Sequence, residues 1–367
     1  MTNYPNNSIC ILNNTLNSGG AEKNCVIICN ELAKRNVVVE LWITKLENSP
    51  LINLLDKRVK VVPIPGKKIR YTFFHLKELM VKKKSTTLLI FNIELLIPAF
   101  FISKLYRLNT KIITRSISTL SLVYNKNENF KKFIWFYLIK YSANRISSII
   151  AQSLGMKQDL IEYFKIKESK IKLIPNPAYN FIFNNDTEKE VLPIWKEILF
   201  VGRLTEAKGL QYLIEIFVLT LQRIPDVHLR IVGTGELENK LKKQVQELGL
   251  TQSVHFEGFQ TDLSHYYKNA IVTVLTSIRE GFPNVLVESI SCGTPIIAFD
   301  CPSGPKEIII PNINGILIEY LNVNDFADAI INTVSGNFKF DKNKVIESSK
   351  RYNLDKIIQQ YQEVLFG

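Results

Sequence analysis

Short apolar runs alternate with longer stretches of helical periodicity along the whole chain. In the first half, seven runs of five to eight mostly apolar residues are predicted to be strands: 8–12, 37–44, 59–64, 87–91, 111–115, 148–152 and 171–175. Six more follow in the second half: 197–203, 227–233, 254–258, 270–276, 294–299 and 315–319. Buried parallel strands have this apolar character because helices cover both faces of their sheet. The pattern therefore predicts an α/β protein with two Rossmann-like, parallel-sheet halves.

The length of the chain also favours two domains. A chain of 367 residues exceeds what one hydrophobic core usually supports. Its hydrophobic content of 46% and charged content of 22% are those of a globular protein. Residues 175–190, which are rich in proline, asparagine and charged side chains, are the predicted linker.

The most informative segment is EGFPNVLVESISCGTP, residues 280–295. Pro283 suits the first position of a helix, because its missing N–H would have no partner there. The free N–H groups of that first turn, together with the helix dipole, form an anion site. Glu280 precedes the helix and Glu288 lies one turn into it, so both could reach hydroxyls on either side of a bound phosphate. A phosphate between two polyols describes a nucleotide-sugar, although an ordinary surface helix with two solvated glutamates remains the alternative.

A second candidate anion-binding element is ILFVGRLTEAKG, residues 198–209. Its apolar start reads as a buried strand, and Arg203 and Lys208 follow in the loop before a helix. Ligands of open α/β sheets bind beyond the carboxyl ends of the strands, where both cations would lie. Arginine offers a planar fork to phosphate oxygens, and lysine offers a mobile point charge. The alternative is a solvated loop with two surface cations.

These two segments resemble the donor-site signatures of the retaining glycosyltransferases of family four, which have the GT-B architecture. Residues 17–23, NSGGAEK, are similar to the glycine loop after the first strand of that family, and IPNP at 174–177 matches the exit from its N-terminal domain. CPSGPKEII, residues 301–309, resembles members that build bacterial surface polysaccharides such as O-antigen or capsule. The resemblance covers essentially the whole chain.

The resemblance implies a fold, an activity and a division of the chain. Two Rossmann-like domains would face each other across a cleft: residues 1–180 would bind the acceptor and residues 181–350 the nucleotide-sugar, while a last helix at about 351–366 would cross back so that 351–367 belong with the first domain. The enzyme would transfer a hexose or an N-acetylhexosamine from a UDP-sugar to a glycan carried on a lipid diphosphate. It would need no cofactor or metal, and the sequence has no Asp-x-Asp motif.

The resemblance also assigns roles to individual residues. Arg203 and Lys208 would stabilise the leaving diphosphate, Glu280 would hold the hexose, and Glu288 would hold the ribose. Further donor contacts are implied at Gly19, Gly20, Gly233, Gly258, Phe259, Gly281, Phe282, Pro283, Asn284 and Val285. Each glycine could instead serve only as a turn former. A dinucleotide site is disfavoured, because no third glycine follows Gly233 and Gly235 at the required spacing.

One position departs from the family pattern. Many members carry a histidine after a central strand of the N-terminal domain, where this chain has Arg115 and Ser116. The four histidines of the chain lie elsewhere, at positions 75, 228, 255 and 265. Arg115 is therefore the predicted contact to the sugar or to an acceptor phosphate, and a mechanism based on histidine is in doubt.

Cysteine usage and hydropathy predict the compartment. Five cysteines without a Cys-x2-Cys pair favour reduced thiols in the cytoplasm. No uninterrupted apolar run reaches the roughly 18–20 residues of a membrane span. The first residues lack the basic and apolar regions of a signal peptide, so a cytoplasmic protein is expected.

The positive charge is concentrated in the first half of the chain. Residues 1–185 hold 28 lysines and arginines against 11 aspartates and glutamates, whereas the remaining residues hold 18 against 23. The cations cluster at 66–84 and 125–145, and the second cluster is mixed with aromatic residues. This combination is typical of an interfacial helix on anionic lipid, although a core helix with solvated lysines is the alternative. No nucleic-acid-binding motif accompanies the charge, so nucleic acid is not an expected partner.

Two other functions remain open at this point. A nucleotide-sugar 2-epimerase with the GT-B architecture would share these features, and turnover of the donor without an acceptor would reveal it. A non-catalytic member that binds a partner transferase or a glycan is the second possibility. The presence of Arg203, Lys208, Glu280 and Glu288 together argues against it.

Overall fold

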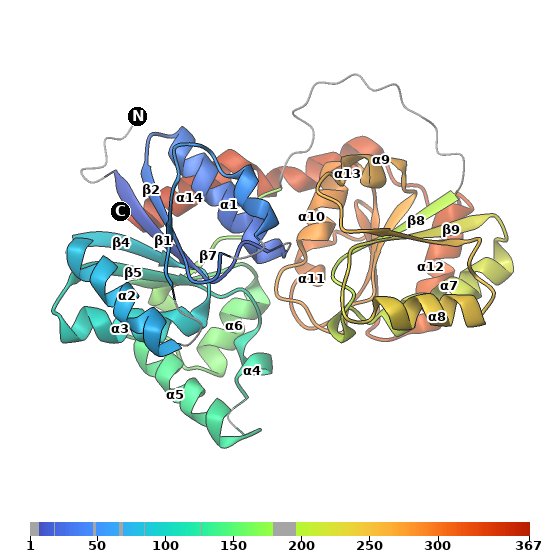
Figure 1. Cartoon of the computed structure of the whole chain (residues 1–367). Coiled ribbons are helices and arrows are strands. Elements are labelled where there is room, and N and C mark those ends of the chain that lie inside the picture. The colour runs from blue at the N-terminus through green and yellow to red at the C-terminus, as the bar shows by residue number, and fades with distance from the viewer. Residues whose placement is uncertain are drawn as a thin grey trace. The chain divides into compact units, whose positions relative to one another are not determined.

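The chain folds into two compact units (Figure 1). The computed structural model describes residues 7–17, 19–46, 49–65, 69–83, 85–125, 127–178 and 196–367. One unit, here unit 1, comprises the residues up to Asn176 together with Asp355–Gly367, and unit 2 runs from Pro177 to Leu354. The sequence placed these divisions at 180/181 and 350/351. Most of the predicted linker falls on residues 179–195, outside the described residues.

Unit 1 contains a seven-stranded parallel sheet. Its strands, in the order in which they lie side by side, are β3 (Lys60–Pro63), β2 (Val38–Ile43), β1 (Ser8–Asn13), β4 (Ser85–Ile90), β5 (Asn109–Arg115), β6 (Ser148–Ala151) and β7 (Ile171–Leu173). Each strand coincides with one of the seven predicted apolar runs, so the predicted parallel α/β class is confirmed. The order reverses between β1 and β4, which makes this edge of the sheet the expected place for a ligand.

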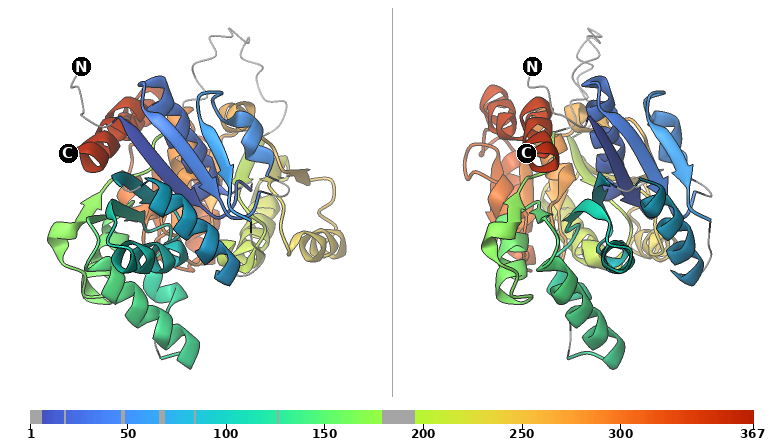
Figure 2. Two further views of the ribbon diagram at one scale, coloured as in Figure 1. Left: turned by 60° about the vertical axis from the view of Figure 1, so that its left-hand side comes forward. Right: turned by 90° about the vertical axis from the view of Figure 1, so that its left-hand side faces the viewer.

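Helices cover both faces of the sheet of unit 1. The larger core cluster lies under α2 (Ile69–Lys83), α3 (Ile93–Leu105), α5 (Phe130–Ala143) and α6 (Leu154–Glu162), near the short helix α4 (Leu120–Val123) (Figures 1 and 2). The opposite face carries α1 (Gly20–Lys34) and the C-terminal helix α14 (Leu354–Phe366). Arg35 at the end of α1 pairs with Asp355 of α14 at 2.5 Å.

The last helix is shorter than the sequence predicted. Lys350–Tyr352 form a separate 3₁₀ turn, and Asn353 is extended before α14 begins. The backbone oxygen of Leu365, near the end of α14, accepts a hydrogen bond from Thr87 of β4 at 3.3 Å. Ile357, Ile358, Tyr361 and Leu365 are the buried residues of α14.

Unit 2 repeats the same strand order with six parallel strands. These are β10 (Val254–Gly258), β9 (Val227–Val232), β8 (Lys196–Val201), β11 (Val272–Leu275), β12 (Ile296–Phe299) and β13 (Gly315–Ile318). All six coincide with predicted runs. Alternate residues of β8 enter two different core clusters, Ile198 and Phe200 on one face and Leu199 and Val201 on the other. Such burial on both faces explains why β8 is apolar at consecutive positions.

The helices of unit 2 also form two layers. One face is covered by α7 (Leu210–Arg223), α8 (Glu238–Glu247) and α12 (Val323–Val334). The other carries α9 (Ser264–Asn269), α10 (Asn284–Ser291), the short helix α11 (Pro305–Ile308) and α13 (Lys342–Ser349). No helix in the described part of the chain combines the length and hydrophobicity needed to cross a membrane.

Candidate functional site

The two predicted anion-binding segments meet at the strand reversal of unit 2. β8 and β11 are neighbours in the sheet, and the loops that follow them are joined by hydrogen bonds. The Thr276 hydroxyl donates to the backbone oxygen of Lys208 at 3.0 Å. The backbone N–H of Ile278 donates to the oxygen of Ala207 at 2.9 Å. Residues that lie far apart in the sequence are thereby held at one edge of the sheet.

Lys208 and Glu280 form an ion pair at this edge. Lys208 Nζ lies 2.6 Å from Glu280 Oε1, and the Ser277 hydroxyl donates to the same oxygen at 2.6 Å. The side chains of the pair are mostly buried, with exposed fractions of 20% and 10%. Two donors on one oxygen fix the orientation of the carboxylate. Ser277 was missed by the sequence reasoning, although it stands only three residues before Glu280.

A glycine makes this arrangement possible. Gly209 follows Lys208 with φ +61°, a left-handed conformation that other residues rarely adopt. A Cβ atom at this position would lie 2.1 Å from the backbone oxygen of Thr276. Gly209 therefore allows the loop after β8 to press against the loop after β11, and α7 begins directly after it.

The helix after Glu280 starts one residue later than predicted. Pro283 is the N-cap of α10, with extended backbone angles, and Asn284 is the first helical residue. Proline carries no N–H, so Asn284 and Val285 contribute the first amides of the helix. The ring of Phe282 packs edge-on against Tyr352, with 5.7 Å between the centroids. The anion site at this helix start stays a prediction, with the first helical residue corrected from Pro283 to Asn284.

Glu288 is buried beside a tyrosine. Its exposed fraction is 6%, and the Tyr267 hydroxyl donates to Glu288 Oε2 at 3.0 Å. Burial, and then the charge of Glu288, hold the pKa of Tyr267 well above its usual value, so the phenol stays protonated as the donor. Tyr267 comes from α9, and no sequence signal linked it to Glu288.

The loop after β12 adds a third segment to this edge. The Ser303 hydroxyl donates to the backbone oxygen of Gly281 at 3.0 Å. Burial and the nearby charge of Glu280 raise the pKa of Cys301 to about 12, so this thiol stays protonated. Residues 301–309, which the sequence connected with surface-polysaccharide enzymes, thus support the turn that leads into α10.

The remaining donor-site predictions for unit 2 lie at the ends of β8, β9 and β10. Gly233 donates its N–H to the oxygen of Gly258 at 2.7 Å, and a Cβ atom on Gly233 would lie 1.9 Å from the oxygen of Gly202. These glycines therefore have a structural role in the close approach of three strand ends. Arg203 and Phe259 are exposed, and their contacts with a donor stay predictions.

In unit 1, the predicted glycine loop follows β1 at the strand reversal. Gly19 is the N-cap of α1 and Gly20 its first residue, while Ser18 lies outside the described residues. A Cβ atom on Gly19 would lie 2.2 Å from Glu22 Oε2. The other oxygen of Glu22 accepts from the Thr15 hydroxyl at 3.2 Å. Glu22, which the sequence analysis did not single out, therefore occupies the space that the glycine leaves.

Arg115 lies in the interior of unit 1. It ends β5 with an exposed fraction of 1%, donates to the side-chain oxygen of Asn176, and stacks 4.7 Å from the centroid of Phe91. Its Nε and Nη1 have no hydrogen-bond partner among the described residues. The predicted contact with a sugar or an acceptor phosphate stays a prediction, because the structure shows the side chain bound to Asn176 of the same unit.

Metal-binding side chains do not gather around these residues. Within the described ranges, no group of three or more histidine, cysteine, aspartate or glutamate side chains is placed to hold a metal ion. His228 Nδ1 lies 3.0 Å from His255 Nε2. These two side chains belong to β9 and β10, however, and not to the loops after β8 and β11.

Two protein-family models match the chain. Residues 185–352 match the model described as glycosyl transferases group 1, and residues 18–178 match the model described as glycosyltransferase family 4. The boundary between the matches lies close to the division between the two units.

Individual relatives are glycosyltransferases. An uncharacterized glycosyltransferase of Methanocaldococcus jannaschii is 32% identical over 60% of this chain, and the match spans 56% of that relative. The N-acetylgalactosamine-N,N'-diacetylbacillosaminyl-diphospho-undecaprenol 4-alpha-N-acetylgalactosaminyltransferase of Campylobacter jejuni is 27% identical over 72% of both chains. The amylovoran biosynthesis glycosyltransferase AmsD of Erwinia amylovora is 25% identical over 97% of this chain and 99% of its own length.

The fold is shared with solved structures. Anabaena HepE in complex with UDP-glucose superimposes with a TM-score of 0.79 over 98% of this chain and 99% of its own. Its sequence identity is 20%, so this likeness concerns the fold.

Proposed function

The chain is a glycosyltransferase of the family-four type with the GT-B fold, and from this premise we propose that it transfers a hexose or an N-acetylhexosamine from a UDP-sugar with retention of configuration. The acceptor is a glycan on a lipid diphosphate, and the product belongs to a bacterial surface polysaccharide. The reaction takes place at the cytoplasmic face of an anionic membrane, and it needs no metal ion.

The observation that carries this proposal is the meeting of Lys208, Glu280 and the start of α10 at the strand reversal of unit 2. A lysine and a helix N-terminus supply positive charge, and two carboxylates supply acceptors for sugar hydroxyls. Glu280 is held by Lys208 and Ser277, and Glu288 by Tyr267, so both carboxylates are fixed before a substrate binds. Such preorganisation is what a site for a charged leaving group requires.

The chemistry follows from where charge develops. As the bond between the sugar and the diphosphate breaks, negative charge grows on the leaving oxygen. Lys208, the exposed Arg203 and the amides of Asn284 and Val285 stabilise this charge more strongly in the transition state than in the ground state. Glu280 orients the hexose and Glu288 holds the ribose. The acceptor attacks from the face of the leaving group, so the diphosphate itself takes the acceptor proton.

The acceptor assignment rests on the names of two relatives. The Campylobacter enzyme is named for a substrate that contains diphospho-undecaprenol, and the Erwinia protein for the biosynthesis of amylovoran. The first name supports a lipid-linked acceptor, and the second supports a role in polysaccharide biosynthesis. Arg115 remains the proposed contact in unit 1 to the sugar or to an acceptor phosphate.

The test is a transfer assay with the purified full-length protein. UDP-glucose, UDP-galactose and their N-acetylated forms are offered with a lipid-diphosphate-linked sugar, with and without EDTA, and the anomeric configuration of the product is determined by NMR. We expect transfer with retention that persists in EDTA. Turnover of the donor without an acceptor would point to an epimerase, and UDP binding without transfer to any acceptor would point to a non-catalytic protein.

A further inference from the structure

Helix α5 of unit 1 exposes a stripe of aromatic side chains. Phe130, Phe133, Tyr137 and Tyr141 have exposed fractions of 76%, 42%, 47% and 47%. Their spacing of three to four residues places them on one face of the helix. The rings of Phe133 and Tyr137 touch, with 4.7 Å between the centroids. These four residues are called the aromatic stripe.

The stripe is distinct from the buried face of α5. Phe136, Ile139 and Ala143 point into the core of unit 1 and account for the packing of the helix. A surface helix normally has polar residues opposite its buried face, whereas α5 is apolar on both sides. In both views of Figure 2 the helix extends away from the sheet. Core packing therefore accounts for one face of the helix but not for its exposed aromatic face.

Helix α3 packs beside the stripe. The buried ring of Phe100 lies with its centroid 5.8 Å from that of Tyr141 and 5.5 Å from that of its neighbour Phe101. Phe101 is exposed there, and so is Leu105 at the end of α3, with an exposed fraction of 70%. Exposed apolar side chains therefore occur on both of these packed helices.

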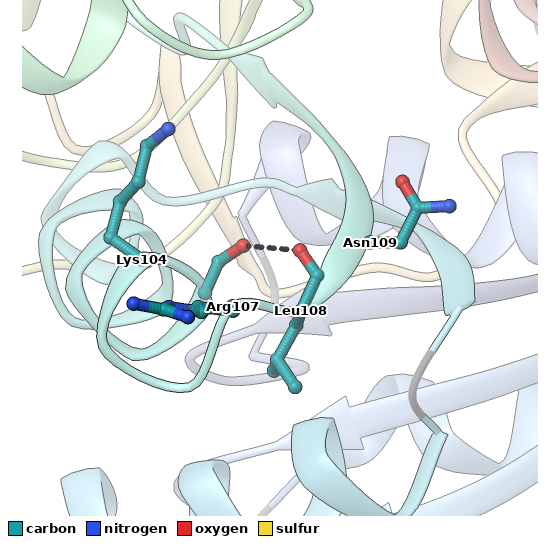
Figure 3. Close-up of a pocket in the computed structure, with 5 residues that line it drawn as sticks. Lys104, Arg107, Leu108 and Asn109 are labelled. Atoms are coloured by element: carbon teal, nitrogen blue, oxygen red, sulfur yellow. Dashed lines mark hydrogen bonds between the residues drawn. The ribbon is translucent and has the colours of Figure 1, made fainter.

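A basic cavity lies at that last turn of α3. It has a volume of about 390 Å³ and is lined by Ser103, Lys104, Arg107, Leu108 and Asn109 (Figure 3). The Ser103 hydroxyl donates to the oxygen of Leu108 at 3.3 Å, which closes the turn. The side chains of Lys104 and Arg107 extend outward from this turn. The cavity therefore offers two cations close in sequence to the exposed Leu105.

The charge around this surface has one sign. Residues 93–145, which include α3 and α5, hold nine lysines and arginines but only two acidic residues. One of the acids, Glu128, pairs with Lys132 at 2.5 Å, and the other, Glu94, accepts a hydrogen bond from the Tyr124 hydroxyl. The segment therefore carries a clear excess of cations, although one of them, Arg115, is buried.

We infer that the aromatic stripe, the end of α3 and the cavity with Lys104 and Arg107 together form a docking surface for an anionic lipid bilayer. Aromatic rings partition into the boundary between head groups and acyl chains, and flanking cations attract anionic lipids. A second copy of this chain fits less well, because it would bring an equal excess of cations against the first. A protein partner would have to be strongly acidic to complement this excess of cations. This inference rests on the proposed function in one respect: it specifies which surface of unit 1 contacts the membrane at which the transfer takes place.

The test measures binding of the full-length protein to vesicles by sedimentation, without donor or acceptor. Vesicles of phosphatidylcholine alone are compared with vesicles that contain phosphatidylglycerol, at low and high salt. We expect binding only to the anionic vesicles and weaker binding at high salt. F130S/F133S should lower the partition coefficient tenfold or more. K104A/R107A should lower it on the order of fivefold for each cation removed.

Matched changes in unit 2 provide the controls. F338S alters a phenylalanine with an exposed fraction of 47%, and K240A/K243A removes two exposed lysines of α8, so both variants should bind like the wild type. Thermal stabilisation by UDP separates this inference from the proposed function, because it should be equal in all variants. Failure of the wild type to bind anionic vesicles, or unchanged binding of F130S/F133S, would overturn the inference. A dimer that F130S/F133S turns into a monomer, without vesicle binding, would do so as well.

Discussion

Lys208 Nζ lies 2.6 Å from Glu280 Oε1, although 72 residues separate the two side chains in the sequence. They meet because β8 and β11, which precede them, are neighbours at the point where the strand order of unit 2 reverses. The cation proposed to stabilise the leaving diphosphate and the carboxylate proposed to hold the hexose are therefore in direct contact. A change at either residue also alters the orientation of the other.

Replacing Lys208 by alanine should slow the chemical step. In the proposed function, Lys208 stabilises the negative charge that grows on the leaving oxygen. Without this lysine, kcat should fall on the order of a hundredfold or more. Steady-state rates with a UDP-sugar measure the effect. The matched control is K196A, which removes another β8-associated lysine that pairs with Asp226 at 2.9 Å on the surface. Equal kcat values for K208A and K196A would contradict a role of Lys208 in the chemical step.

Replacing Tyr267 by phenylalanine should weaken donor binding without slowing the chemistry. The change removes the hydroxyl that orients Glu288 and leaves a buried carboxylate with one donor fewer. A hydrogen bond to a charged group contributes roughly 1.5–3 kcal/mol, so KM for the donor should rise about tenfold or more. Tyr163→Phe, which removes a hydroxyl that donates to Asn125, is the control and should leave KM unchanged. A large fall in kcat with an unaltered KM would show that Tyr267 acts differently.

Alanine substitutions at two glycines should distinguish the cost of backbone strain from the cost of a steric clash. Gly209 and Gly249 both have positive φ, at +61° and +70°, but a Cβ atom on Gly249 would meet nothing within 4 Å. G249A should lower the free energy of unfolding by about 1–2 kcal/mol through strain alone. G209A should cost clearly more, because its Cβ would press on the backbone oxygen of Thr276. Urea unfolding measures both, and equal costs would show that the loops after β8 and β11 yield easily.

His255 should make stability depend on pH. Burial, and then the charges of Arg230 and His228, lower the pKa of His255 below its ordinary value of 6.5. Between the lowered pKa of the folded chain and the ordinary value of 6.5 in the unfolded chain, the unfolded chain binds more protons. The free energy of unfolding therefore rises with pH across this window, and the contribution of His255 is lost as the pH falls below 6.5. Melting temperatures between pH 5 and 8 should fall less steeply at the acid end for H255Q than for the wild type. The exposed His265 gives the control H265Q, and identical profiles for H255Q and the wild type would contradict this interpretation.

The strands could be predicted from the sequence, and the segments proposed to bind the donor could be singled out, because both signals are local. Buried parallel strands such as β8 are apolar at consecutive positions, and all thirteen observed strands lie on predicted runs. The donor loop was recognisable because Glu280, Pro283 and Glu288 stand close together in one segment. The start of α10 was misplaced by one residue, since a proline fits both the N-cap and the first turn.

The partners of the site residues could not be predicted, because they come from other elements. Tyr267 reaches Glu288 from α9, and Thr276 reaches the backbone of Lys208 from the end of β11. The burial of Arg115 was equally hidden, since a cation at the end of a strand usually faces solvent. Asn176 and Phe91, which hold it, lie on separate segments of unit 1.

The most direct test of the central claim is a calorimetric titration of UDP, in the presence of EDTA, into the wild type and into the Glu288→Gln variant. The wild type should bind UDP without a metal ion. The Glu288→Gln variant should bind UDP about tenfold or more weakly, because a charged acceptor for the ribose is lost. Absence of UDP binding by the wild type, or equal affinities for the two proteins, would contradict a donor site at this edge of unit 2.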